Sequence, residues 1–121
     1  MSFTVPEGKL YNLAMIKEIS HGNNDFVKKM MALFNETMPA AIAELKQHLS
    51  TSNWSDLGAV AHKIKPSIDT VGIELLKEDI RTIEKNAKEL SNLSEIPDLL
   101  EKLEMVLNKV MDDLNEEMNA M

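Results

Sequence analysis

One stretch decides the fold, and it reads Trp54-Ser55-Asp56-Leu57-Gly58-Ala59-Val60-Ala61-His62-Lys63-Ile64-Lys65-Pro66-Ser67-Ile68-Asp69. On a helix with about 100° per residue, its apolar side chains fall on a single stripe. That stripe consists of Leu57, Val60, Ala61, Ile64 and Ile68. The stretch therefore predicts an amphipathic helix packed against a core, with His62 well off the buried stripe.

The same helical period recurs along most of the chain, and no segment shows the alternation of a half-buried strand. Apolar stripes predict a short first helix near residues 9–20, a long second helix with a stripe over 26–49, and further helices over 76–90 and 99–114. Short polar breaks join them, so the four long helices should pack as antiparallel neighbours. We therefore predict an all-α fold, an antiparallel four-helix bundle with a short additional N-terminal helix, as one domain over residues 1–121.

Two prolines and one glycine mark expected irregularities in these helices. Pro39 removes a backbone donor inside the second helix, which predicts a kink or break near residues 35–38 with Thr37 capping a restarted segment. Pro66 leaves the carbonyl of His62 without its helical partner and predicts a slight bend there. Gly72 predicts a helix end or bend.

Composition excludes several classes of protein. The 121 residues are enough for one core without crosslinks, and the lack of cysteine excludes a disulfide framework and a thiol nucleophile. No signal peptide or membrane span is visible, so we expect a cytoplasmic protein with no membrane association. The formal charge of −7 argues against nucleic-acid binding, which needs a basic surface.

The off-stripe position of His62 predicts an exposed imidazole. We expect Gly58, Pro66 and Asp69 to share its face, and the compact Gly58 and Pro66 to leave an open approach to the ring. A neutral imidazole is a good nucleophile near pH 7, and a phosphoryl group is a suitable electrophile for it. Lys65 lies one turn further on, where its ammonium can pair with the negative charge of a bound phosphoryl group.

The residues around His62 resemble those of the histidine-containing phosphotransfer (HPt) domain family. The family pattern is Ala-His-x-hydrophobic-Lys-Gly-Ser, with a glycine ten residues after the histidine and a leucine-rich helix following. This chain carries Ala61-His62-Lys63-Ile64-Lys65-Pro66-Ser67, then Gly72-Ile73-Glu74-Leu75-Leu76, with Asn53-Trp54 similar to the turn before the helix. The resemblance covers about residues 24–90 and departs at Pro66, where glycine is usual.

This resemblance implies a four-helix bundle with His62 exposed midway along one helix, and reversible phosphoryl exchange with the aspartate of a receiver domain. It also implies that Lys65 accompanies the phosphoryl group and that Gly72 is the small residue near the histidine. We therefore predict a phosphorelay intermediate of two-component signal transduction that carries phosphohistidine at His62 and has no independent turnover. The expected partners are response-regulator receiver domains and a sensor or hybrid histidine kinase, and the expected oligomeric state is a monomer.

The residues expected to bind a partner around His62 and Lys65 are Gly58, Lys63, Pro66, Asp69 and Gly72. We expect no cofactor, because the chain has no phosphate-cradling glycine-rich loop, and any Mg²⁺ should belong to the partner receiver. A metal site is not expected either, because Asp69 is the only possible ligand near His62 and it lies two turns away.

Two other hypotheses stay open from the sequence. The chain could be a helical docking module that regulates a receiver or a kinase without carrying phosphate, although His62 and Lys65 argue against this. It could also be a small hydrolase with His62 as general base, but a bundle of this size offers no evident substrate pocket. Met30 and Met31 are expected in the core, with a receiver-docking patch as the alternative.

Overall fold

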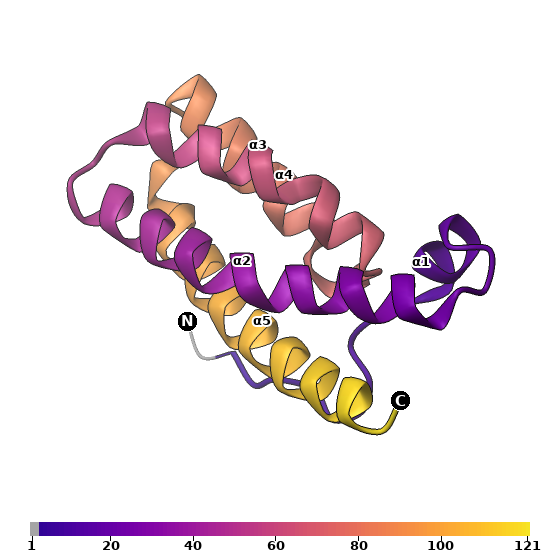
Figure 1. Ribbon diagram of the computed structural model, residues 1–121. Coiled ribbons are helices and arrows are strands. Elements are labelled where there is room, and N and C mark those ends of the chain that lie inside the picture. The colour runs from indigo at the N-terminus through magenta and orange to yellow at the C-terminus, as the bar shows by residue number, and fades with distance from the viewer. Residues whose placement is uncertain (1–2) are drawn as a thin grey trace.

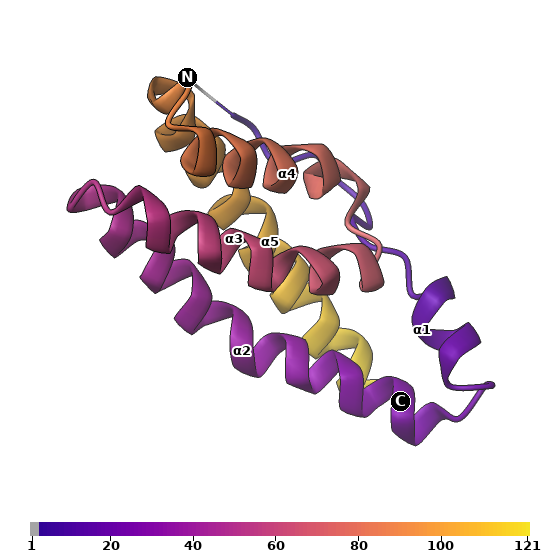
Figure 2. The same ribbon diagram turned by 90° about the horizontal axis from the view of Figure 1, so that it is seen from above.

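The computed structural model describes residues 3–121, which form α-helices, one short 3-10 helix and no strand (Figure 1). The elements are α1 (Ala14–Ile19), α2 (Asn24–Ser50), α3 (Trp54–Thr70), α4 (Glu74–Glu89), η1 (Leu93–Glu95) and α5 (Ile96–Asn119). Helices α2 to α5 make an antiparallel bundle, and α1 lies at one end of it (Figure 2). The predicted all-α four-helix bundle with a short extra N-terminal helix is therefore confirmed.

Local sequence signals explain where the long helices begin. The Asn23 side chain accepts a hydrogen bond from the Phe26 N–H at the start of α2, and Asn53 accepts one from the Asp56 N–H at the start of α3. These caps satisfy backbone donors that have no partner within the helix. Pro97 occupies the first turn of α5, where the missing N–H costs nothing.

The core lies between the four long helices. All five residues of the predicted α3 stripe are buried, which confirms the face that this helix turns inward. Helix α3 packs most extensively against α4, and α2 packs against both α3 and α5. Because α3 packs between α2 and α4, side chains on either side of its buried stripe face one of these two helices.

Three sequence-based boundaries were wrong. The first helix begins at Ala14 rather than near residue 9. Residues 9–13 are not helical, although Tyr11 and Leu13 are buried in the core. Helix α2 is continuous through Pro39, and the Thr37 hydroxyl donates to the Leu33 carbonyl within it rather than capping a new segment. Leu90 leaves the α4 stripe because it adopts a left-handed conformation (φ 52°) and is 65% exposed.

Gly72 fixes the turn between α3 and α4. Its φ is +69°, and a Cβ built on it would lie 2.4 Å from the carbonyl oxygen of Asn12. The Asn12 N–H donates to the Val71 carbonyl (3.0 Å), so the N-terminal segment crosses the turn in direct backbone contact. Only glycine combines this backbone conformation with this approach.

In the described part of the chain, no helix is both long and apolar enough to cross a membrane.

Candidate functional site

His62 lies in the middle of α3 with 64% of its side chain exposed, as predicted from its position off the apolar stripe. Its i+3 neighbour Lys65 faces α4, and its i+4 neighbour Pro66 faces the space between α3 and α2. The imidazole therefore stands between the α3–α4 contact and a groove beside α2, with open solvent above it.

Glu84 of α4 holds one edge of the imidazole. Its Oε2 lies 2.6 Å from Nδ1 of His62, and its side chain is only 10% exposed. Lys65 donates to Oε1 of the same carboxylate (2.8 Å), and Lys88 donates to Oε2 (3.0 Å). One buried carboxylate thus joins the histidine to two cations from α3 and α4.

This arrangement sets the ionisation of Glu84 and the tautomer of the neutral His62 ring. Hydrogen bonds, first from Lys65 and then from Lys88 and His62, lower the pKa of Glu84 from 4.5 to about 2 against the opposing effect of burial. Glu84 is therefore ionised at neutral pH and can only accept hydrogen bonds. It follows that Nδ1 of His62 carries the proton, so the lone pair of the neutral ring lies on the opposite nitrogen, Nε2.

The side chains of Lys65 and Lys88 differ in their exposure to solvent. The Lys65 side chain is 27% exposed, whereas that of Lys88 is 56% exposed. Glu84 holds both ammonium groups near the Nδ1 edge of the imidazole. The two ammonium groups provide two mobile positive charges, which suit a doubly charged anion.

Sequence analysis missed Glu84 and Lys88. The signal for Glu84 was present, because it falls on the α4 stripe beside Ile80, Ile83 and Ala87, all of which are buried. A carboxylate on a buried stripe needs a partner, and a cationic or imidazole group is the usual one. Lys88 follows four residues later on the same helix, at ion-pairing distance.

Gly58 and Gly72 lie where parts of the chain pack closely together. Gly58 is buried, so its predicted place on the exposed face was wrong; a Cβ there would lie 3.4 Å from Ala87 Cβ and from Lys88 Cγ. The missing side chain lets α3 and α4 approach closely beside the site. Gly72 lies past the end of α3, in contact with Asn12 rather than beside the imidazole.

Asp69 is engaged in an ion pair. Its two carboxylate oxygens accept from Nη1 (3.1 Å) and Nη2 (2.6 Å) of Arg81 on α4, and this guanidinium is the main cause of its lowered pKa. The bidentate pair ties α3 to α4 at the end of the bundle beyond Lys65. Asp69 is thus not a free ligand for an incoming group.

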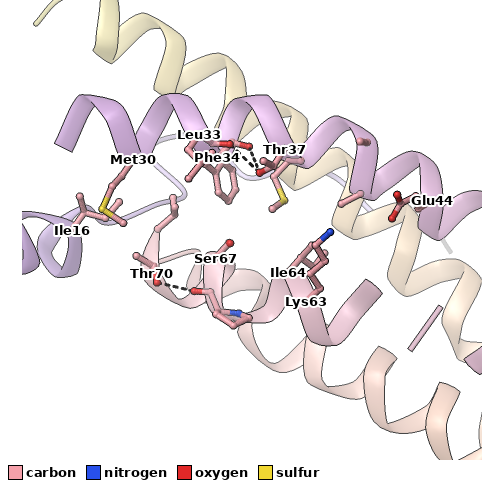
Figure 3. Close-up of a pocket in the computed structure, with 15 residues that line it drawn as sticks. Ile16, Met30, Leu33, Phe34, Thr37, Glu44, Lys63, Ile64, Ser67 and Thr70 are labelled. Atoms are coloured by element: carbon pink, nitrogen blue, oxygen red, sulfur yellow. Dashed lines mark hydrogen bonds between the residues drawn. The ribbon is translucent and has the colours of Figure 1, made fainter. Parts of the chain in front are cut away.

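Lys63 and Pro66 line a groove of about 470 Å³ between α2 and α3 (Figure 3). Most of its surface is apolar, and Met30 contributes to one wall while Met31 is fully buried. Met31 therefore belongs to the core, as expected, whereas Met30 reaches the surface beside α3. The groove lies along the same part of α3 as His62, because Lys63 and Pro66 line it.

Among residues 3–121 no three His, Asp or Glu side chains are grouped so that they could hold a metal ion. The contacts around His62 bring together one imidazole, one carboxylate and two ammonium groups.

Comparison with protein families agrees with this geometry. The Hpt domain family matches residues 29–117, a span that contains His62, Lys65, Glu84 and Lys88, and the chain belongs to this family. Family membership implies histidine phosphotransfer in two-component phosphorelays, through interaction with two-component kinases and receivers. Searches of curated proteins and of solved structures gave no match.

Proposed function

We propose that this protein is a phosphorelay intermediate. It accepts a phosphoryl group on Nε2 of His62 from one receiver aspartate and passes it to the aspartate of another receiver. The observation that carries the proposal is the 2.6 Å contact between Nδ1 of His62 and the ionised carboxylate of Glu84. It leaves the exposed ring with a single available nucleophilic nitrogen, held in a fixed orientation.

The proposed transfer balances without a cofactor on this chain. Nε2 attacks the phosphorus of an aspartyl phosphate, an N–P bond forms, and the bond from phosphorus to the aspartate oxygen breaks to leave a carboxylate. The imidazole becomes positively charged with its proton still on Nδ1, where Glu84 stabilises it. Return of the group reverses each step, and any Mg²⁺ acts on the receiver's carboxylates.

Lys65 and Lys88 serve the phosphoryl group in this proposal. Both ammonium groups are within 3.0 Å of Glu84, so they are already beside the imidazole before the group arrives. A phosphoryl group brings close to two negative charges near neutral pH and three acceptor oxygens. Each lysine can pivot toward these oxygens, with the more exposed Lys88 the freer to do so.

An apolar surface on α1 and the N-terminal half of α2 supports docking of a partner protein. Its exposed members are Met15, Ile19, Phe26 and Leu33, at 41–57% relative exposure, on α1 and α2. Of these four, Leu33 lines the groove between α2 and α3, together with Met30. Large exposed apolar side chains on neighbouring elements are typical of protein-binding surfaces. We propose that this chain acts as a monomer in the cytoplasm and that receivers dock here, with their phosphoaspartate over His62.

A phosphotransfer assay tests the proposal. Wild type, His62→Gln and the control His48→Gln are mixed with a panel of purified, phosphorylated receiver domains and Mg²⁺, and the label is followed on gels. We expect acid-labile, base-stable label on wild type and His48→Gln only. Label that persists on His62→Gln would place the phosphoryl group elsewhere, and equal binding without label on any variant would favour a docking module.

A further inference from the structure

The groove between α2 and α3 has an apolar end and a charged end. The apolar end is lined by Ile16, Met30, Leu33 and Phe34. At the other end Lys63 of α3 and Glu44 of α2 project from opposite walls (Figure 3). Among the described residues that line the groove, these two are the only charged ones.

Neither the Lys63 ammonium nor the Glu44 carboxylate is paired with another described residue of the chain. Lys63 and Glu44 are both exposed, and neither makes a hydrogen bond or an ion pair of 4.0 Å or less with any residue of 3–121. The lysines of the phosphoacceptor site are different, because Lys65 and Lys88 are both bound to Glu84. The groove thus presents one free cation and one free carboxylate to whatever enters it.

We propose that Lys63 and Glu44 are specificity-determining residues that select which receiver exchanges phosphate with His62; this rests on the proposed function. The occupant is an amphipathic helix of the receiver. Its apolar side chains enter the end lined by Met30 and Leu33, a carboxylate on it pairs with Lys63, and a cation on it pairs with Glu44.

The arrangement favours discrimination over affinity. An apolar groove alone accepts many amphipathic helices in either direction, because burial of apolar surface is not directional. Two opposite charges at one end distinguish the two directions and penalise a helix that brings like charges to them. Lys63 directly follows His62 in the sequence, so the same contact fixes the position of the partner relative to the imidazole.

Charge reversal separates this role from the chemistry. Lys63→Glu and Glu44→Lys are compared with two matched reversals outside the groove, Lys28→Glu and Glu101→Lys. Lys28 is on α2 but lines a different hollow, and Glu101 is exposed on α5, which contributes nothing to the groove. Each variant is labelled by phosphoramidate, which needs no docking, and by the receiver that labels wild type fastest.

We expect each groove reversal to lower the initial rate of transfer from that receiver by about tenfold or more, with labelling by phosphoramidate unchanged. The control reversals should stay within about twofold of wild type. Reversal of one acidic residue on the receiver helix should then restore exchange with Lys63→Glu and not with Glu44→Lys.

Three results would overturn the proposal. Groove reversals that behave like the controls would show that the charges do not select the receiver, while the proposed function stands. Slower labelling of Lys63→Glu by phosphoramidate would assign Lys63 to the chemistry instead. A wild-type chain that no receiver labels would overturn the proposed function and this inference together.

Discussion

Glu84 Oε2 lies 2.6 Å from His62 Nδ1, so a residue of α4 sets the orientation of an imidazole that α3 carries. The carboxylate is nearly buried while the ring is mostly exposed. The reactive edge therefore faces solvent, and its position depends on the packing of two helices rather than on α3 alone. Disturbing the contact between α3 and α4 should disturb the chemistry even where His62 is untouched.

Replacing Glu84 by alanine should slow phosphorylation of His62 about tenfold to a hundredfold, the range expected for loss of a hydrogen bond to a charged group. Glu84→Gln, which keeps an acceptor oxygen, should recover part of the rate. The rate of labelling by phosphoramidate measures this effect. Imidazole ¹⁵N shifts by NMR should show that the Nδ1–H tautomer dominates in wild type and not in Glu84→Ala.

Glu78→Ala is the control for this comparison, because Glu78 is exposed on α4 and makes no contact with His62. It should match wild type in rate and tautomer. Unchanged tautomer populations in Glu84→Ala would mean that the carboxylate does not position the ring, whatever happens to the rate.

Lys65→Ala should impair phosphotransfer more than Lys88→Ala, because Lys65 is less exposed and its hydrogen bond is the main cause of the low pKa of Glu84. The double variant should lose more than either single one, since each lysine can cover for the other at the phosphoryl group. Transfer rates and the half-life of the phosphorylated protein provide the measurement. Lys85→Ala serves as the control, because Lys85 is exposed on α4 and Glu84 is bonded to Lys65 and Lys88 instead. Equal losses in all three single variants would indicate an effect of net charge alone.

The sequence predicts the buried stripe of α3 and the exposed position of His62, but not the contacts that α3 makes with α4. The spacing of Leu57, Val60, Ala61, Ile64 and Ile68 is a property of one helix, and it is enough to place His62 on the exposed side. Glu84 is 22 residues away from His62, and only the antiparallel packing of α3 on α4 brings the two together. Periodicity gives the face of a helix but not its register against a neighbour. For the same reason the sequence does not predict that Arg81 of α4 engages Asp69.

Proline at position 39 shows a second limit of local rules. A kink or a break is expected near residues 35–38, because Pro39 removes a backbone hydrogen bond. The break does not occur, since α2 runs unbroken to Ser50. Packing of Phe34, Met38, Ile42 and Leu45 into the core holds the helix on both sides of Pro39. The stabilisation from several buried side chains exceeds the roughly 3 kcal/mol that an interior proline costs.

Acid should remove the stability that Glu84 contributes. Its pKa falls from 4.5 to about 2 in the folded state, so its contribution is complete above about pH 5 and is lost as the pH falls toward 2. That contribution is at most about 3 kcal/mol, and less because solvent screens the exposed Lys88. Urea unfolding of wild type and Glu84→Gln at pH 7, 5, 4 and 3 should show wild type the more stable at pH 7, with the difference narrowing below pH 5. A difference that stays constant down to pH 3 would contradict the lowered pKa, and Glu78→Gln provides the reference for an exposed carboxylate.

Gly72→Ala should destabilise the fold without removing the chemistry. Two costs add at this position: a left-handed backbone (φ +69°), and a Cβ 2.4 Å from the Asn12 carbonyl oxygen. Gly22→Ala isolates the first cost, because Gly22 has φ +80° and nothing within 4 Å of its Cβ. We expect about 1 kcal/mol for Gly22→Ala and at least about 2 kcal/mol for Gly72→Ala by urea unfolding. Labelling of His62 by phosphoramidate should stay near the wild-type rate wherever the variant is folded. If Gly72→Ala instead costs no more than Gly22→Ala and slows labelling, the glycine acts at the histidine rather than at the turn that anchors the N-terminal segment.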